Sequence, residues 1–421
     1  MDRVILHVDA NGFYASCECA VRPEISGLPV IVGGSVELRK GIVLAKNELA
    51  KKYGIYTGMN VREAMAKCPG LVSLEPDYAL YTRFSRDLQA IYYRYTDQIE
   101  GFGLDEAWTD MTGSTHLFGD GKSIADQIRE TVRRELGITV SVGVSFNKIY
   151  AKLGSDMRKP NATTVITREN FKARIWPLPA ADLLYVGPAS AKKLREAGIR
   201  TIGQLAAADE SLLGMILGKW GTVLGRFANG LDDSPVAKVK ESWEAEPSPK
   251  SVGNSVTLPR DVSTAEDVRK VFYQLSESVA SRLRETGLKA KTVQICVCDN
   301  AFAAAGHQGQ LPYPSCLTAE IAEKAAEIYN DKYVYKRPIR GLGVRTSNFA
   351  GKNAPEQLDL FGDCQNRWRH EKLELMVDSV RRRYGHFIIQ RGMLMEDAAL
   401  TGENPRDHTV HPVSYFDGPI V

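Results

Sequence analysis

The sequence predicts a multidomain chain in which the first part is α/β and a later part is α+β. Its 421 residues correspond to two to four domains at about 100 to 200 residues per domain. Over the first 165 residues, short apolar stretches alternate with amphipathic ones, as in α/β folds. A polar, proline-containing stretch at 235–250 then divides the chain, and strands mixed with helices follow it.

The α/β part begins with a buried strand at 4–8, where an apolar run ends beside Asp9. Apolar runs and amphipathic patterns predict further strands at 29–34, 41–46 and 138–145, and helices at 47–56, 61–67, 80–97, 122–136 and from about 147. The segment 80–97 repeats apolar and aromatic residues every three or four positions, which is typical of an amphipathic helix.

The later regions show two further patterns. Residues 177–230 are helical with short turns, which predicts a small all-helical domain. The stretch 251–349 is the α+β part, with strands expected at 251–258, 292–298 and 340–348 and helices at 264–286 and 318–330. Apolar residues at helical spacing in 371–384 predict one more short helix.

Composition excludes several classes of protein. With 43% hydrophobic and 25% charged residues, the chain matches ordinary globular proteins and not disordered, fibrous or disulfide-stapled ones. No run approaches the roughly 18 apolar residues of a membrane span, and the N-terminus has no signal-peptide layout, so we expect a cytoplasmic protein with reduced cysteines. The net charge of +3 means that any nucleic-acid binding must come from local clusters.

Three carboxylates suggest the chemistry. Asp9 ends the first strand, and the pair Asp105 and Glu106 can reach it only if two strands lie side by side. Such a cluster repels itself unless cations bind, and oxygen ligands suit Mg²⁺ or Mn²⁺. Two such ions would serve phosphoryl transfer. The alternative is that Asp105 and Glu106 form a helix start or a surface pair.

The residues around these carboxylates resemble a known family. The segments DANGFYASCE (9–18), LDEA (104–107) and SFNKIYAKLGSDMRKPN (145–161) are similar to the three signature blocks of Y-family translesion DNA polymerases, the bacterial DNA polymerase IV type. The resemblance runs from residue 1 to about 349 and implies a right-hand polymerase. Its expected parts are a palm (1–12 and 74–166), small fingers (13–73), a thumb with a helix-hairpin-helix (167–234), a linker (235–250), a little finger (251–349) and a tail (350–421).

The resemblance also implies the active site. Asp9, Asp105 and Glu106 are expected to bind two Mg²⁺ ions as the catalytic carboxylates, with the backbone carbonyl of Ala10 as a further ligand. Tyr14 matches the steric gate that excludes a 2′-hydroxyl from the incoming sugar, and Phe13 packs beside it. Without the family context, this aromatic pair would be read as core.

Two lysines are expected to contact the nucleotide. Lys159 resembles the family's triphosphate-binding lysine, and a point cation there would neutralise developing charge. Lys51 stands where many members have an arginine, so it offers charge without a bidentate fork. The chain departs from the family at Glu48, where many members have a tyrosine, and at Gly103, where a serine usually precedes Leu-Asp-Glu.

DNA contacts are predicted in two regions. The segment around Gly187 resembles a helix-hairpin-helix whose backbone N–H groups hold a phosphate, reinforced by Lys192 and Lys193. In the expected little finger, acids cluster on the helices while bases lie at or near the strands, which predicts a basic sheet formed by Lys289, Lys291, Arg340 and Arg345.

The remaining expectations concern partners. The pattern Gln357, Leu358, Leu360 and Phe361 matches the Q-L-x-L-F peptide with which bacterial polymerases dock on the sliding clamp. We expect a monomer that binds primer-template DNA and deoxynucleoside triphosphates and bypasses lesions with low fidelity and no proofreading. The alternatives are a non-catalytic DNA- and clamp-binding accessory subunit of a mutagenesis complex, and a two-metal nuclease.

Overall fold

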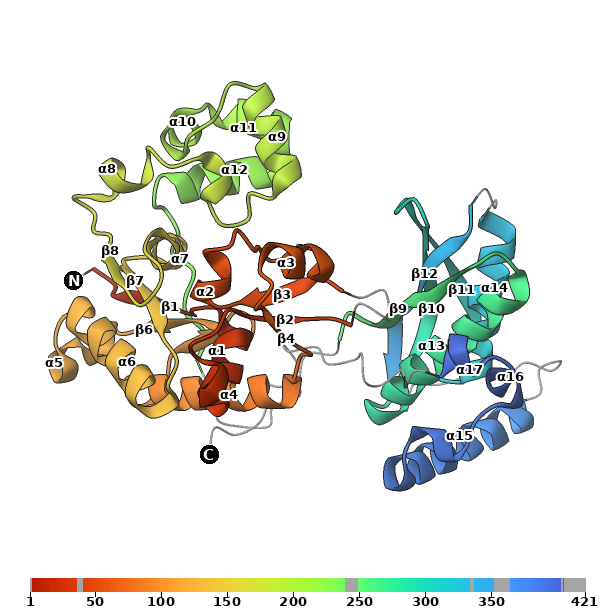
Figure 1. Ribbon diagram of the computed structural model, residues 1–421. Helices are drawn as coiled ribbons and strands as arrows, with labels where there is room; N and C mark the ends of the chain where they lie inside the picture. Colours follow the sequence, from red (N-terminus) through yellow and green to blue (C-terminus); the bar gives the residue numbers. More distant parts are fainter. Residues whose placement is uncertain are drawn as a thin grey trace. The chain divides into compact units, whose positions relative to one another are not determined.

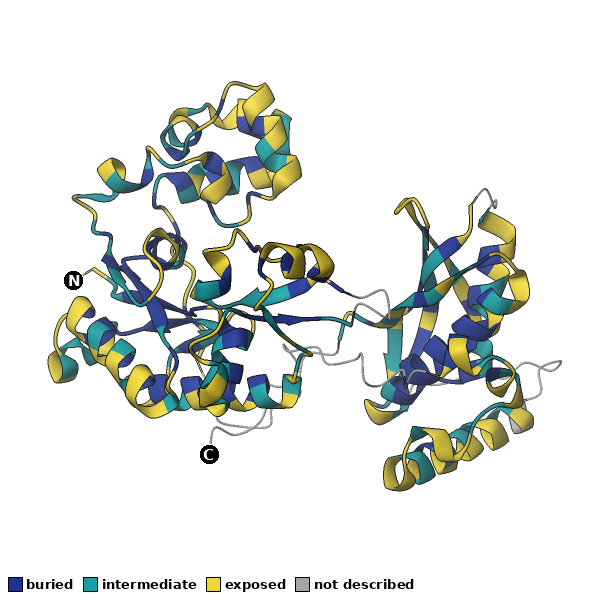
Figure 2. Cartoon of the chain, in the orientation of Figure 1, coloured by how far each residue is buried: buried dark blue, intermediate teal, exposed yellow. Residues whose placement is uncertain are grey.

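The computed structural model describes residues 2–35, 41–238, 249–333, 337–351, 364–402 and 404. These residues form two compact units, the first within 2–238 and the second from 249 onward. Each unit has its own buried core (Figure 2). Among the helices in the described ranges, none has the length and apolar character needed to span a membrane.

A five-stranded sheet forms the centre of the first unit, in the order β5-β6-β1-β7-β8 (Figure 1). Strand β1 (Ile5–Ala10) is antiparallel to β6 (Glu106–Asp110) and to β7 (Val140–Ser145). The outer strands are β5 (Ile99–Gly101) and β8 (Thr163–Val165). Every residue of β1 is buried, because neighbouring strands flank it and helices cover both faces of the sheet.

Side-chain alternation gives β1 two different faces. Leu6 and Val8 point into a core shared with α4 (Tyr78–Tyr93) and α6 (Gly121–Leu136). His7 points the other way, toward α7 (Lys148–Met157), since its ring meets Ser155 of that helix. Because side chains alternate along a strand, Asp9 lies on the α7 face as well.

Gly143 of β7 allows α7 to pack closely on the sheet. A Cβ at this position would lie 1.9 Å from the carbonyl oxygen of Ala151 and 2.5 Å from the backbone nitrogen of Ser155. Since backbone atoms cannot move aside as a flexible side chain can, Gly143→Ala is expected to lower the free energy of unfolding by about 3 kcal/mol.

Urea unfolding followed by circular dichroism measures this effect. Gly113→Ala is the matched control, because a Cβ at Gly113 meets no atom within 4 Å and the effect there should stay within about 0.5 kcal/mol. Equal midpoints for the two variants would contradict the close packing of α7 on β7.

A smaller sheet with the order β3-β2-β4 lies within the expected fingers. Its strands are β2 (Val30–Gly33), β3 (Val43–Lys46) and β4 (Val72–Leu74). The helices of the same region are α1 (Phe13–Val21), α2 (Glu48–Lys51) and α3 (Val61–Lys67). The helix predicted at 47–56 is only one turn long. It cannot continue to residue 56, because Gly54 takes a positive φ angle that a helix does not contain.

Short helices complete the first unit. They are α5 (Thr115–Phe118), α8 (Phe171–Ile175), α9 (Pro188–Glu196), α10 (Ile202–Ala207), α11 (Glu210–Leu217) and α12 (Lys219–Ala228). As the sequence predicts, residues 177–230 are helical, and their core extends to Tyr150 and Leu153 of α7.

The second unit has three layers. Its sheet has the order β11-β10-β12-β9, all antiparallel, and α13 (Ala265–Glu285) and α14 (Thr318–Lys332) cover one face. The strands are β9 (Ser251–Val262), β10 (Leu288–Asp299), β11 (Ala304–Ser315) and β12 (Ile339–Gly351). Helix α15 (Cys364–Tyr384) packs on α13 and α14, followed by α16 (Gly392–Met395) and α17 (Ala398–Thr401). The tail helix predicted to begin at 371 therefore begins earlier, at Cys364.

Candidate active site

The predicted carboxylates meet at one end of β1. In the antiparallel ladder Asp9 lies directly opposite Glu106, and the backbone N–H of Ala10 donates to the carbonyl oxygen of Asp105 at 3.0 Å. Asp105 immediately precedes β6. The structure thus brings together residues that are almost 100 positions apart in the sequence, and it does so through strand pairing.

Two lysine ammonium groups lie among these carboxylates. The Nζ atom of Lys152, on α7, is 3.0 Å from Asp9 Oδ2 and 2.6 Å from Glu106 Oε2. Lys159 Nζ is 2.8 Å from Asp9 Oδ1, and both lysines also contact Asp156. Although burial opposes a charge on either lysine, the nearby carboxylates raise the pKa of both, so both remain protonated. The acidic cluster is therefore largely neutralised by cations of the chain itself.

The carboxylates differ in their pKa values. Burial, together with the charges of Glu106 and Asp9, raises the pKa of Asp105 to about 6. Burial also acts on Glu106, but the contact with His7 and the charge of Lys152 outweigh it and lower the pKa of Glu106 to about 2. Perturbed groups of this kind cluster at functional sites.

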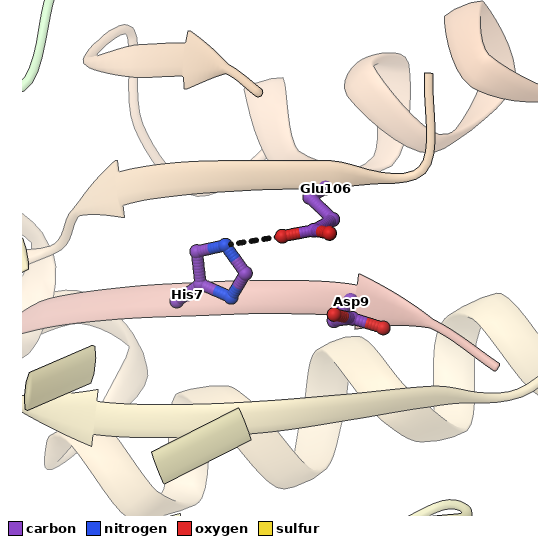
Figure 3. A group of neighbouring side chains, drawn as sticks. All are labelled: His7, Asp9 and Glu106. Carbon is purple, nitrogen blue, oxygen red and sulfur yellow. Dashed lines mark ion pairs between the residues drawn. The ribbon is translucent and has the colours of Figure 1, made fainter. Parts of the chain in front are cut away.

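His7 is a member of this cluster that the sequence did not suggest (Figure 3). Its Nε2 is 3.2 Å from Glu106 Oε2, and its Nδ1 is 2.8 Å from the hydroxyl oxygen of Ser155. Donor atoms of His7, Asp9 and Glu106 all lie within 4.8 Å of one another, a group that Asp105 does not join. A histidine two positions before Asp9 on the same strand must share its face, and this spacing was the available signal.

Asn11 holds the loop that carries Lys159. Its side-chain Oδ1 accepts a hydrogen bond from the backbone N–H of Asn161 at 2.8 Å, and its Nδ2 donates to Ser141 at 3.0 Å. The loop after α7 is thereby fixed against the end of β1. Lys152 and Asn11 both lie inside the signature blocks, yet their roles depend on packing that the sequence does not display.

Tyr14 lies close enough to Asp105 for the charge of that carboxylate to affect its pKa. It is half-buried on α1 and stacks on Tyr81 with ring centroids 4.3 Å apart, and the hydroxyl of Tyr81 donates to Glu18 at 2.7 Å. Burial, with contributions from Tyr78 and Asp105, raises the pKa of Tyr14 to about 12. Phe13 is fully inside the core. The ring of Tyr14 is therefore held rigidly and remains uncharged.

Lys51 and Glu48, two residues of the expected fingers, pair with each other. Lys51 is exposed on the one-turn helix α2, with its ammonium 3.6 Å from the carboxylate of Glu48. Glu48 thus pairs with the lysine that was expected to contact phosphate. Gly103 has a φ of +84°, so the residue that replaces the usual serine takes a conformation that glycine adopts without strain.

The predicted helix-hairpin-helix residues form an exposed helix start. Gly187 is the N-cap of α9, and Lys192 and Lys193 are exposed on that helix. Tyr185, at the place of the motif's usual first glycine, takes a φ of +71°. A phosphate contact at this turn remains a prediction.

The predicted basic sheet requires one correction. The Lys289 ammonium lies 2.7 Å from the carboxylate of Glu371 on α15, and its side chain is only 10% exposed, so it does not belong to a DNA-facing surface. Arg345 is exposed and lies opposite Gln294 across β10 and β12, on the face away from the core. Lys291 is exposed, and Arg340 is half-buried over the ring of Phe302.

The proposed clamp peptide, Gln357, Leu358, Leu360 and Phe361, lies outside the described residues.

The cluster fits hard divalent cations by its donor chemistry. Its carboxylates are the oxygen ligands that Mg²⁺ and Mn²⁺ prefer. It already attracts two ammonium groups, one of which bridges Asp9 and Glu106. A buried acidic cluster on adjacent strands of a palm-like sheet is the arrangement expected of an enzyme that transfers nucleotidyl groups.

Comparison with known proteins agrees with this class. Residues 8–156 match the impB/mucB/samB family, and residues 249–360 match the C-terminal domain of that family. The DNA polymerase IV of Acetivibrio thermocellus is 50% identical over 400 residues, covering 95% of this chain and 99% of that protein. The DNA polymerase IV of Clostridium kluyveri is 35% identical, covering 94% of this chain and 99% of that protein.

The fold agrees as well. A solved structure of a Y-family DNA polymerase chimera is similar with a TM-score of 0.71, at 24% identity, covering 82% of this chain and 98% of the chimera. The chain belongs to the impB/mucB/samB family and is a Y-family DNA polymerase of the DNA polymerase IV type.

Asp105 is a metal ligand predicted from the family resemblance, and its raised pKa sets the pH dependence expected of metal binding. A carboxylate must be deprotonated to hold a cation, and Asp105 gains its proton as the pH falls through about 6. The Kd for Mn²⁺ should therefore increase about tenfold between roughly pH 7 and pH 5. Electron paramagnetic resonance of free Mn²⁺ measures this, and Asp105→Asn should flatten the dependence. An equally steep dependence in that variant would assign the proton to another group.

Proposed function

We propose that the chain carries out template-directed DNA synthesis past damaged bases by two-metal-ion nucleotidyl transfer. The observation that carries the proposal is the pairing of β1 with β6, which sets Asp9 opposite Glu106. The backbone N–H of Ala10, the next residue of β1, donates to the carbonyl oxygen of Asp105. The two lysine ammonium groups offset much of the charge of this cluster, but the pKa of Asp105 is still raised to about 6, so keeping this carboxylate buried here is unfavourable unless it has a use. A non-catalytic accessory subunit would have no need of it.

The residues that would hold two Mg²⁺ ions are Asp9, Asp105 and Glu106, with the backbone carbonyl of Ala10. Mn²⁺ could take the same place. When bound, these ions supply electrostatic stabilisation of the attacking and leaving oxygens. His7 and Ser155 restrict the carboxylate of Glu106 to one side of the cluster.

Lys159 and Tyr14 would act on the incoming deoxynucleoside triphosphate. The Lys159 ammonium would neutralise phosphate charge, and its loop is already fixed by Asn11. The ring of Tyr14, packed on Tyr81, would leave no room for a 2′-hydroxyl. Lys51 would add charge after its ion pair with Glu48 opens.

Low fidelity without proofreading is part of the proposal. The expected fingers, residues 13–73, are small, and their described α-helices α1, α2 and α3 have only nine, four and seven residues. Fingers of this size offer little surface to enclose and check a base pair. Sliding-clamp binding through Gln357, Leu358, Leu360 and Phe361, a monomeric state and a cytoplasmic location remain predictions from the sequence.

Primer extension tests the proposal. Full-length protein is given Mg²⁺, four deoxynucleotides, and primers annealed to an undamaged or a lesion-bearing template. Extension past the lesion that stops on chelation with EDTA would support the proposal. Binding of primer-template without extension would favour an accessory subunit, and shortening of the primer would favour a nuclease.

A further inference from the structure

Helix α15 lies beyond the family match, which ends at residue 360, and forms a third layer on the second unit. It packs on α13 and α14, the helices that cover the sheet. The contact is made by charged side chains. This arrangement decides which residues of α15 face inward and which face solvent.

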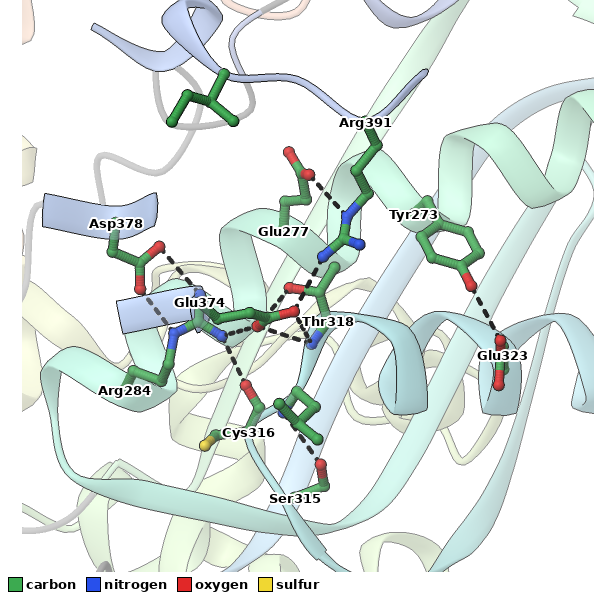
Figure 4. A network of polar contacts seen from close by, with 12 residues as sticks. Tyr273, Glu277, Arg284, Ser315, Cys316, Thr318, Glu323, Glu374, Asp378 and Arg391 are labelled. Carbon is green, nitrogen blue, oxygen red and sulfur yellow. Dashed lines mark hydrogen bonds and ion pairs between the residues drawn. The ribbon is translucent and has the colours of Figure 1, made fainter. Parts of the chain in front are cut away.

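The acids of α15 face the helices beneath it, and Figure 4 shows two of them, Glu374 and Asp378. Arg284 of α13, whose side chain is 5% exposed, pairs with Glu374 and lies 2.6 Å from Asp378. Glu371 pairs with Lys289 at 2.7 Å. Each acid of the helix is therefore used to hold it against the domain.

Bases on the same side complete the attachment. Arg381 lies 3.0 Å from the buried carboxylate of Glu277, which also binds Arg391 at 3.0 Å. Arg367, near the start of the helix, pairs with Glu320 of α14 at 2.7 Å. Contacts from both ends fix the rotation of α15 about its axis, so its outward face is well defined.

The outward face carries only positive charge. Arg369, Lys372 and Arg383 are exposed, and none of them makes an ion pair within the described ranges. Arg382 is also exposed and reaches Glu285 only at 3.7 Å. Since the acids of the helix are all turned inward, the net charge of +3 for the whole chain conceals a strongly basic strip.

Exposed aromatic rings accompany these bases. Trp368 is 49% exposed and Tyr384 is 61% exposed, and the guanidinium of Arg383 lies 5.1 Å from the ring centroid of Tyr384. The two rings stand near opposite ends of the helix, about 24 Å apart at 1.5 Å per residue. Flat aromatic rings exposed beside cations are surfaces on which nucleic-acid bases can stack.

We propose that this outward face, formed by Trp368, Arg369, Lys372, Arg383 and Tyr384, binds single-stranded DNA. Cations that follow a sugar-phosphate backbone and aromatic rings that stack on bases are the two elements of such sites. The face lies across α13 and α14 from the sheet, so it is separate from the predicted basic sheet. An acidic protein segment would match the charge and could also cover Leu373, Leu375 and Met376, which are exposed on α15, but it would not require flat rings beside the cations. The inference rests on the proposed function in one respect, namely that the strand bound is the polymerase's template.

The test measures binding of a labelled oligothymidylate of about 16 nucleotides to the full chain by fluorescence anisotropy. EDTA is present, and nucleotides are omitted. The triple variant Arg369→Ala, Lys372→Ala, Arg383→Ala should bind at least about tenfold more weakly. The slope of log affinity against log salt should fall by about 2, because three phosphate contacts are lost.

Two further variants make the outcome specific. Lys122→Ala, Arg133→Ala, Arg134→Ala removes the same charge from the exposed side of α6 and should bind as the wild type does. Trp368→Phe keeps an aromatic ring at this position, so the fold should be retained. Oligothymidylate that stacks on Trp368 should quench its intrinsic fluorescence, and this variant should therefore show less quenching on binding than the wild type.

Binding and salt slope that are unchanged in the α15 triple variant would overturn the proposal and would leave an acidic protein as the better fit. Equal losses in both triple variants would overturn it too. Because the assay contains no metal or nucleotide, its failure leaves the polymerase proposal standing. Conversely, failed primer extension with intact oligonucleotide binding would affect only the polymerase proposal.

Discussion

Asp105→Asn is expected to reduce nucleotide incorporation about a thousandfold, which corresponds to about 4 kcal/mol of transition-state stabilisation. Asparagine keeps the shape of the side chain but removes the charge that cations require. The same change should stabilise the protein. Burial and the neighbouring acids raise the pKa of Asp105 from 3.8 to about 6, so its charge is unfavourable in the folded state at neutral pH.

The sign of the stability effect follows from this shift. Above about pH 6 the folded protein carries a charge that the unfolded chain accommodates better, and removing it should add about 2 kcal/mol to the free energy of unfolding. Below the unfolded pKa of about 4 the group is neutral in both states, and the gain should vanish.

Single-turnover incorporation and urea unfolding at two pH values measure both effects. Glu130→Gln, on the exposed side of α6, is the control for loss of a carboxylate and should change neither quantity by much. Loss of activity together with loss of stability would indicate a damaged fold and would contradict the catalytic role assigned to Asp105.

Tyr14→Ala should lower the preference for deoxynucleotides over ribonucleotides about a hundredfold, while incorporation of deoxynucleotides stays within a fewfold of wild type. Steric exclusion of one hydroxyl group corresponds to about 3 kcal/mol. The ring can exclude it because Tyr14 is clamped by stacking on Tyr81, whose hydroxyl donates to the buried carboxylate of Glu18. A ring held in this way cannot swing aside at low cost.

Competition between the two nucleotide types on an undamaged template measures the preference. Tyr14→Phe is the matched variant. It keeps the ring and removes only the hydroxyl, so its preference should equal that of the wild type. A large change in Tyr14→Phe would mean that the hydroxyl discriminates, and no change in Tyr14→Ala would remove the steric role altogether.

The sequence predicted the central fold from local apolar patterns and the acidic cluster from the family resemblance. The apolar run before Asp9 specifies a buried strand, and the family resemblance brings Asp105 and Glu106 beside it. In the structure, the pairing of β1 with β6 sets Asp9 directly opposite Glu106. The strand predicted at 292–298 lies within β10, where Val293, Ile295 and Val297 are buried at alternate positions.

The unpredicted parts depend on which helix packs on which face. Lys152 reaches the cluster only because Gly143 lets α7 approach the sheet, and nothing in the lysine's own neighbourhood indicates this. The assignment of Lys289 to a DNA-facing sheet was wrong because its partner, Glu371, lies 82 residues later on a helix expected to start elsewhere. Long-range ion pairs leave no periodic trace in a sequence.

The ammonium groups of Lys152 and Lys159 have a consequence for how the protein matures. In the folded chain, three acids lie together, and Lys152 and Lys159 pair with two of the three. These lysines come from the following helix and its loop, so folding of the palm need not wait for metal. Lys159 pairs with Asp9 in this structure and is also the lysine proposed to bind the phosphate of the nucleotide. If Lys159 moves to the phosphate, Asp9 loses this partner, so substrate binding would free the Oδ1 atom of this carboxylate.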